Sequence, residues 1–353
     1  MILCRTPFRI SFFGGGTDYP SWYFKNGGSV LSTSINKYCY ISLRYLPPFF
    51  EHRIRLVYSK IELCQKFTEI QHPAVRETLR FMEINNGLEI HHDGDLPARS
   101  GMGSSSSFIV GLLNALYALK GKRVTKKRLA LESIEIEQNL IKETVGSQDQ
   151  VAAAFGGLNH IIFKENGEID VNPITVSVRR SDELNSNLML FYTGIIRTAS
   201  DIAQSYVPDI LRKEKLLYKM HDMVDDSITI LHGKNSIEDF GILLNETWQA
   251  KRQLSGKVTN PIVDDFYERA LKKGALGGKI TGAGGGGFLL LFVPPNAQVQ
   301  VRKELSELLH VPFRFDFTGS KIIAYEPHLD EFSNIDKVPD NNCAGRFGER
   351  STI

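Results

Sequence analysis

Alternation of hydrophobic and polar positions predicts several strands in the first half of the chain. Residues 9–13 form one such run and lead into a glycine turn at residues 14–16. Further runs of strand-forming composition lie at residues 38–46, 54–58, 88–92, 158–163 and 188–192. Residues 125–142 instead begin with a capping Thr125 and carry apolar positions at helical spacing, which predicts a helix among these strands.

The second half of the chain is dominated by helical spacing. Long helical patterns cover residues 203–231, 237–254 and 261–272, and after them come a glycine run at 282–287, a strand at 288–293, a short helix and a strand near 313–317. Helices that lead into a few strands are typical of a separate α+β layer domain. We therefore expect an α+β protein with two domains, at residues 1–190 and 191–330, and a polar tail at residues 331–353.

Composition narrows the class of protein. The 353 residues are enough for two cores, and 42% hydrophobic with 23% charged residues is typical of soluble globular proteins. A net charge of +2, spread along the chain, excludes a nucleic-acid footprint. The N-terminus lacks the zones of a signal peptide, and no apolar run approaches the ~18 residues that span a bilayer. Scattered cysteines disfavour a zinc site and a disulfide framework. We expect a cytoplasmic protein without nucleic-acid or membrane partners.

The strongest chemical signal lies between Leu96 and Ser107. Gly101 and Gly103 let the backbone approach a ligand, and four serines follow where an apolar helix begins near Phe108. A helix N-terminus presents unpaired N–H groups and a partial positive charge, so this turn suits a phosphate group. Taken alone, a serine-rich helix cap is an equal alternative.

Two further glycine-rich segments, residues 14–19 and 279–287, also lie at the edges of predicted elements. Glycine clusters cost conformational entropy and are tolerated where the backbone turns sharply or contacts a ligand. Each segment alone could be a plain turn. Three of them in this order, each with its own flanking residues, indicate a shared ligand site.

The three segments resemble the motifs of the GHMP kinase superfamily. The motif Pro-x-Arg…Gly-x-x-Thr-Asp is matched by Pro7, Arg9, Thr17 and Asp18. The motif Pro-x-x-x-Gly-Leu-Gly-Ser-Ser is matched by Pro97 and residues 101–105, with Met102 in place of Leu. The motif Gly-Ala-Gly-Gly-Gly is matched by residues 282–286. The resemblance extends from Pro7 to about Phe317. It implies an N-terminal domain like ribosomal S5 domain 2, a C-terminal ferredoxin-like α+β domain, and an ATP- and Mg²⁺-dependent kinase.

The resemblance also implies roles for individual residues. Asp149 and Arg9 are the expected catalytic residues, and Ser105 and Glu137 the expected Mg²⁺ ligands. The expected ATP-binding residues are Pro97, Gly101, Met102, Gly103, Ser104, Ser105 and Ser106. The expected substrate-binding residues are Gly15, Gly16, Thr17, Asp18, Arg197, Gly282, Gly284 and Gly285.

The chemistry of the two acidic residues fits these roles. Ser147 can cap a helix that has Asp149 in its first turn, where the helix dipole, together with Arg9, favours the ionised carboxylate. Such a carboxylate can accept a proton from a sugar hydroxyl that attacks a γ-phosphate. A capping role is the alternative for Asp149. For Glu137 the alternative is a solvated face of a charged helix, although its spacing to Asp149 resembles that of galactokinase-type members.

The first glycine turn narrows the expected sugar. Galactokinases carry Glu-His where Gly15 and Gly16 stand, which disfavours galactose. The runs Gly-Gly-Gly-Thr-Asp, Gly-Ser-Gln-Asp-Gln and Phe-Gly-Gly resemble D-glycero-D-manno-heptose 7-phosphate kinases and, less closely, L-fucokinases. The resemblance implies phosphorylation of the anomeric C1 hydroxyl to a 1,7-bisphosphate, for nucleotide-heptose and surface polysaccharide biosynthesis. Arg197 is our first candidate for the 7-phosphate contact, ahead of Arg99 and Lys37.

Three alternatives stay open at this stage. One is a kinase of L-fucose or another free sugar. Another is a non-catalytic sensor of sugar and nucleotide, which would need neither an ionised base nor metal ligands. A dinucleotide-binding protein is disfavoured, because no GxGxxG follows the first strand with an acidic residue about twenty positions later. The resemblance leaves a homodimer open.

Overall fold

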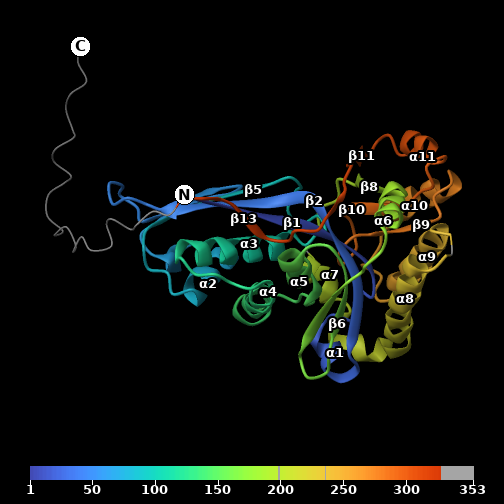
Figure 1. Ribbon diagram of the computed structural model, residues 1–353, viewed down its shortest axis with the longest axis horizontal. Coiled ribbons are helices and arrows are strands. Elements are labelled where there is room, and N and C mark those ends of the chain that lie inside the picture. The colour runs from blue at the N-terminus through green and yellow to red at the C-terminus, as the bar shows by residue number, and fades with distance from the viewer. Residues whose placement is uncertain (198, 235, 327–353) are drawn as a thin grey trace, which may run out of the picture.

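The computed structural model describes residues 1–197, 199–234 and 236–326, which form two sheets with their helices (Figure 1). The larger sheet has the strand order β13-β1-β2-β5-β3-β4; in addition, β12 and β6 pair with β2, and β7 pairs with β6. Its strands are β1 (Ile2–Phe13), β2 (Gly28–Tyr45), β3 (Ile54–Val57), β4 (Ile61–Cys64), β5 (Leu88–Gly94), β6 (Leu158–Phe163), β7 (Ile169–Pro173), β12 (Phe315–Asp316) and β13 (Lys321–Tyr325).

Helix α3 (Ser104–Leu119) forms the core of the first unit by packing on β1 and β2. Its apolar residues surround the helix almost completely and are buried, as expected of a helix covered on all sides. Gly111 permits the close approach, because a Cβ there would lie 2.9 Å from Oγ1 of Thr6. Around α3 lie α2 (Pro73–Phe81), α4 (Lys126–Glu135) and α5 (Gln148–Phe155). The short helix η1 (Phe67–Glu69) packs on α2, the π-helix η2 (Ile136–Leu140) packs on α2 and α4, and α1 (Pro20–Asn26) contacts η3 (Val207–Lys213) of the other unit.

The smaller sheet has the order β11-β8-β10-β9 and carries most of the later helices. Its strands are β8 (Leu188–Tyr192), β9 (Gly277–Ile280), β10 (Phe288–Phe292) and β11 (Leu309–His310). The helices are α6 (Val178–Ser186), α7 (Ala199–Ala203), η3 (Val207–Lys213), α8 (Glu214–His232), α9 (Glu238–Arg252), α10 (Pro261–Lys272) and α11 (Gln298–Glu304). Phe240 of α9 packs edge-to-face on Phe12 and Phe13 of β1, with ring centroids 5.3 and 4.9 Å apart, so the two units share apolar contacts.

The predicted elements are found in most places, with two corrections. The helix predicted at residues 203–231 is broken into α7, η3 and α8. Pro208 has no N–H to donate and Asp209 adopts non-helical angles (φ −107°, ψ 17°), so a continuous helix cannot pass this point. Helix α3 begins at Ser104, before the expected Phe108, since Gly103 with φ of 73° ends the preceding turn.

Strand pairing departs from the expected division of the chain. The expected boundary at residue 190 falls within β8, which pairs with β10 along its whole length. The strand expected near residues 313–317 is β12, and β13 follows it; both fall in the segment expected to belong to the C-terminal unit, yet they pair with β2 and β1 of the larger sheet. β13 thereby covers an edge of β1 that would otherwise expose its main-chain groups. The expected tail at residues 331–353 lies outside the described residues.

Two expectations of the sequence analysis, on membrane spans and on cysteines, concern features that the described residues contain. None of the helices in these ranges is long and apolar enough to cross a membrane. Cys4, Cys39 and Cys64 are buried free thiols.

Candidate active site

The three glycine-rich segments meet around one cavity of about 350 Å³, a size within the range of small-molecule sites. The turn after β1, the N-terminus of α3 and the segment that leads into α5 supply one side of it. The smaller-sheet unit supplies Ser200, Tyr206, Lys251 and Gly282. Segments more than 260 positions apart, such as Gly15 and Gly282, therefore line the same space.

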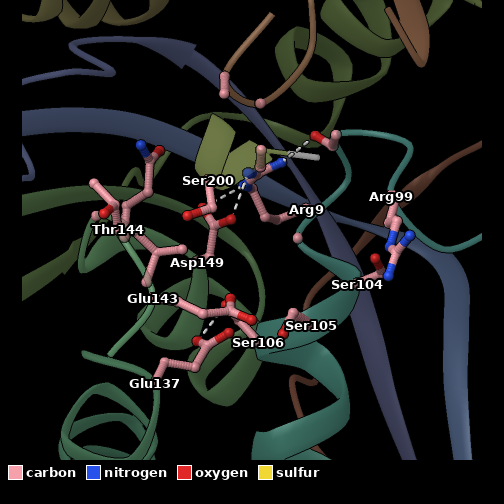
Figure 2. Close-up of a pocket in the computed structure, with 18 of the residues that line it drawn as sticks. Arg9, Arg99, Ser104, Ser105, Ser106, Glu137, Glu143, Thr144, Asp149 and Ser200 are labelled. Atoms are coloured by element: carbon pink, nitrogen blue, oxygen red, sulfur yellow. Dashed lines mark hydrogen bonds and ion pairs between the residues drawn. The ribbon is translucent and has the colours of Figure 1, made fainter. Parts of the chain in front are cut away.

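A partly buried ion pair lines this cavity. Arg9 donates from Nε to Oδ1 of Asp149 at 2.7 Å and from Nη2 to Oδ2 at 2.6 Å, while its Nη1 donates to the carbonyl of Gly101 at 2.8 Å. The Arg9 side chain is 5% exposed, whereas that of Asp149 is 24% exposed and faces the cavity. This bidentate pair fixes the carboxylate in one orientation. The pairing of Arg9 with Asp149 is thus as expected, and Figure 2 shows it beside the serine loop.

The serine loop presents a helix N-terminus to the cavity. Gly101 and Gly103 have φ of 82° and 73°, which favours glycine at both positions. The first hydrogen bond of α3 runs from Ser107 N to Gly103 O, so the amides of residues 104–106 precede the helical ladder. Ser104, Ser105 and Ser106 line the cavity, and this combination suits an anion.

Glu137 is buried at the floor of the same cavity, not on a solvated helix face. Its Oε2 accepts hydrogen bonds from Ser106, at 2.7 Å, and from Gln150. Its Oε1 is buried and has no partner among the described residues. Burial raises the pKa of Glu137 to about 7, although the neighbouring side chains of Ser106, Gln150 and Ser105 act in the opposite direction. A buried carboxylate oxygen without a partner, close to a serine hydroxyl, fits a hard cation such as Mg²⁺.

The turn after β1 is locked to the start of α5. Asp18 accepts the amide of Gly16 at 2.9 Å and that of Gln148 at 3.4 Å. A Cβ at Gly146 would lie 1.9 Å from Oδ2 of Asp18, so only glycine fits there. Burial raises the pKa of Asp18, and the charge of Asp149 raises it further. The structure therefore places a buried carboxylate at the cavity wall, next to the catalytic candidate.

Not every expected site residue lines the cavity. The expected residues that do are Arg9, Gly15, Gly16, Asp18, Gly101, Gly103, Ser104, Ser105, Ser106, Glu137, Asp149 and Gly282. Pro97, Met102, Thr17, Arg197, Gly284 and Gly285 are not among its lining residues.

The residues outside the cavity support its loops. Thr17 is buried in its own turn, where its hydroxyl contacts the main chain of Gly14 and Ser29. Met102 packs in the core, and its carbonyl accepts the amide of Arg9. Arg197 is exposed beside Gly285. Ser147 occupies the N-cap of α5, but its hydroxyl contacts Tyr23 and Gln138 and does not cap the helix, so that expectation is wrong.

Sequence reasoning missed several lining residues. Those not assigned to the site are Ser11, Tyr19, His72, His92, Phe108, Glu143, Thr144, Gln148, Ser200, Tyr206 and Lys251. Gln148 and Tyr19 carried a signal, because they stand in the runs Gly-Ser-Gln-Asp-Gln and residues 14–19, and Ser11 and Phe108 lie in the strand and helix predicted beside the glycine segments. The others come from elements that only the fold brings to the cavity.

One end of the cavity is aromatic. The ring of Phe108 lies 5.1 Å from that of His72 and 5.0 Å from that of His92. Burial lowers the pKa of both histidines, which favours their neutral form near pH 7. At the opening, Arg99 adopts a left-handed φ of 58° and extends towards Ser104 (Figure 2). A flat apolar ring fits the aromatic end, and an anion fits the opening.

Two family models match parts of the chain, and relatives match nearly all of it. The model described as GHMP kinases N terminal domain matches residues 67–157, and that described as GHMP kinases C terminal matches residues 229–311. The D-glycero-alpha-D-manno-heptose 7-phosphate kinase of Campylobacter jejuni is 30% identical over 334 residues, which cover 90% of this chain and 96% of that protein. The L-fucokinase/L-fucose-1-P guanylyltransferase of Bacteroides fragilis is 26% identical over 86% of this chain and 36% of its own length.

A solved structure shows the same arrangement of elements. The D-glycero-D-manno-heptose 1-phosphate kinase of Bacteroides thetaiotaomicron superposes with a TM-score of 0.75, over 92% of this chain and 100% of that chain. Its sequence is 23% identical, so this likeness concerns the fold.

Proposed function

Because the chain belongs to the GHMP kinase family, we propose that it transfers the γ-phosphoryl group of ATP to the C1 hydroxyl of D-glycero-D-manno-heptose 7-phosphate, giving the 1,7-bisphosphate. The expected family, fold and phosphotransferase class are confirmed by the matches. The observation that carries the proposal is the Arg9–Asp149 pair, which faces the same cavity as the serine-loop N-terminus. The Campylobacter relative supports a heptose phosphate as acceptor.

Asp149 orients the acceptor in this proposal. Arg9 holds both carboxylate oxygens, and each oxygen keeps a lone pair that can accept a hydrogen bond from the sugar hydroxyl. The hydroxyl oxygen attacks the γ-phosphorus, the bond to the β–γ bridging oxygen breaks, and ADP leaves. The carboxylate of Asp149 accepts the hydrogen bond of the hydroxyl and takes up its proton as the new P–O bond forms. Most of the catalysis then comes from positioning and charge.

The serine loop and Glu137 hold the phosphate end of ATP. The amides of residues 104–106 would face the phosphate oxygens, and Arg99, whose side chain extends towards Ser104, would approach them from the opening of the cavity. Ser105 and the unpartnered Oε1 of Glu137 would hold Mg²⁺. When bound, Mg²⁺ neutralises charge on the β- and γ-phosphates. His72, His92 and Phe108 would then surround the nucleobase.

The proposed sugar site lies between the turn after β1 and the start of α5. Gly15 faces Ser11 and Gln148, and Oγ of Ser11 and Oε1 of Gln148 are buried without a partner in the described part of the chain. Asp18 adds a carboxylate to the same wall. Unpartnered polar atoms around a small cavity suit the hydroxyls of a sugar.

A panel of sugars with ADP release as readout tests this function. We expect turnover with Mg²⁺-ATP and heptose 7-phosphate, and a phosphorus NMR signal of an anomeric phosphate in the product. If no anomeric sugar supports ADP formation, the kinase proposal fails. A free-sugar kinase is the second candidate, favoured by the match to the L-fucokinase, and preferential turnover of L-fucose would establish it.

Gly15→Ala is expected to raise KM for the sugar about tenfold and to leave KM for ATP unchanged. The added Cβ would lie 3.5 Å from Oγ of Ser11 and 3.6 Å from Nε2 of Gln148, which are ordinary contacts, so the fold tolerates it while the sugar loses space. Gly256→Ala is the control, because a Cβ there meets nothing within 4 Å. Steady-state kinetics with each substrate varied measures the effect, and an equal rise in both KM values would contradict a sugar-specific role.

A further inference from the structure

Lys251 is a buried cation in the cavity wall that none of the motifs includes. It lies in the last turn of α9, is 4% exposed and lines the cavity. A lysine at the end of a surface helix ordinarily interacts with the helix dipole from the solvent side. Here Nζ of Lys251 instead donates a hydrogen bond to the main-chain carbonyl of Gly282. The side chain therefore leaves its own helix and reaches the third glycine segment.

This hydrogen bond places Lys251 where two loops cross. A Cβ on Gly282 would lie 2.7 Å from the carbonyl oxygen of Gly101, so the two glycines touch. The Gly101 carbonyl also accepts Nη1 of Arg9. Lys251 and Arg9 thus reach the same crossing from the two units of the fold. The serine loop starts at this crossing, and Asp149 is bound to Arg9 beside it.

Lys251 differs from Arg9 in having no carboxylate partner. Within residues 1–326 as described, no ion pair joins it to an acidic side chain at 4 Å or less. The charged groups that face it are Arg9 from β1, Asp18 from the following turn, Asp149 from α5 and Lys279 from β9. Burial and then the charge of Arg9 lower the pKa of Lys251 to about 8, against the opposite influence of Asp18 and Asp149.

Lys279 is a second buried lysine, and it differs from Lys251 in its position relative to the cavity. Nζ of Lys279 donates to the carbonyl of Phe12 at 2.9 Å, and Lys279 does not line the cavity. An ammonium group has three N–H donors. Lys251 uses one of them on Gly282 and borders a space that has to receive highly charged phosphates. A buried, unpaired cation is costly in the empty fold and becomes favourable when an anion binds next to it.

We infer that Lys251 binds a phosphoryl group of the reactants at the crossing of the Gly101 and Gly282 loops. This inference rests on the proposed kinase function and deepens it. Two reactants carry such a group, the γ-phosphate of ATP and the phosphate on the sugar, and their oxygens offer an ammonium the same chemistry. Lys251 then complements Arg9, whose charge is already neutralised by Asp149.

The test compares Lys251→Met, Lys251→Arg and the control Lys257→Met, which removes an exposed lysine outside the cavity lining. Titration calorimetry measures the affinity for a non-hydrolysable ATP analogue and for ADP, each in the presence of Mg²⁺ and the absence of sugar. Separate titrations measure the affinity for heptose 7-phosphate and for unphosphorylated heptose in the absence of nucleotide. Thermal unfolding checks the fold, which Lys251→Met should retain because methionine keeps most of the aliphatic stem and removes a buried charge.

Lys251→Met is expected to lower the affinity for one phosphoryl-bearing ligand by about 10- to 100-fold, and Lys251→Arg is expected to recover part of this affinity. If only the affinity for the ATP analogue falls and that for ADP does not, the group that Lys251 binds is the γ-phosphate. If only the affinity for heptose 7-phosphate falls, the group that Lys251 binds is the sugar phosphate. Wild-type affinity should also fall as the pH rises past about 8, where the ammonium loses its proton, and this fall should be absent in Lys251→Arg.

Two results would overturn the inference. One is wild-type affinity of Lys251→Met for all four ligands, and the other is an equal loss for heptose and its 7-phosphate with nucleotide binding unchanged. Arg197→Ala runs in parallel as the competing assignment, and a loss specific to heptose 7-phosphate in that variant alone would also count against Lys251. Failure of the wild type to phosphorylate any heptose would refute the proposed function and still leave the nucleotide titrations interpretable.

Discussion

Asp149→Asn is expected to lower kcat by about 10²- to 10⁴-fold, with little change in the affinity for Mg²⁺-ATP. The amide keeps one acceptor for Arg9 but cannot take up the proton of the attacking hydroxyl, and it turns an N–H group towards a guanidinium that donates. Its effect therefore falls on the step in which the hydroxyl attacks. Single-turnover kinetics with saturating sugar and ATP measures this step.

The control for Asp149→Asn is Asp170→Asn. Asp170 lies on β7, pairs with Lys164 and does not line the cavity, so the same chemical change there should leave kcat unaltered. Unchanged binding of an ATP analogue shows that the cavity of Asp149→Asn remains formed. A kcat within threefold of the wild type would contradict the role of Asp149 in orienting the acceptor.

Glu137→Gln is expected to lower kcat by at least about 10²-fold at ordinary Mg²⁺ concentrations and to raise the Mg²⁺ concentration needed for half-maximal rate. Glutamine can keep both hydrogen bonds, since its Oε1 can accept from Ser106 and Gln150 as Oε2 of Glu137 does. The neutral amide replaces the unpartnered oxygen that fits the cation. Stability should not fall, because a buried charge is removed.

Glu135→Gln is the matched control, since Glu135 is exposed, lies in the turn just before η2 and is absent from the cavity lining. Rates are measured across a Mg²⁺ titration at fixed ATP. A parallel loss in both variants, or a normal Mg²⁺ dependence in Glu137→Gln, would assign Glu137 a structural role in place of cation binding.

Local pattern predicted the elements whose signal is short-range. Strand-forming runs predicted β5, β6, β10 and the second half of β1, and helical spacing predicted α10 at the residues where it is found. The break at Pro208 was missed, although a proline within a helical pattern is itself a local signal. β9 and β13 were missed because Gly-Gly-Lys-Ile and a short strand near the end of a chain carry little alternation.

The candidate site was predicted where residues lie in motifs. Arg9, Asp149 and the serine loop were assigned through their resemblance to the GHMP kinase motifs, and the structure brings them together in one cavity. Thr17 and Met102 show the limit of this reasoning. Both belong to motifs, yet both are buried in support of the loops, because a motif records which residues the local backbone needs as well as which ones face the ligand.

The sequence by itself indicated the family and its phosphotransferase chemistry through three motifs, and it predicted the three loops, since their glycines and serines favour turns and helix starts locally. Only the tertiary structure decided that Glu137 is buried with one unpartnered oxygen, that β13 returns to β1, and that Lys251 reaches Gly282. These facts depend on contacts between residues far apart in the chain. Burial and pairing of a charge are properties of such contacts, so spacing along one chain cannot specify them.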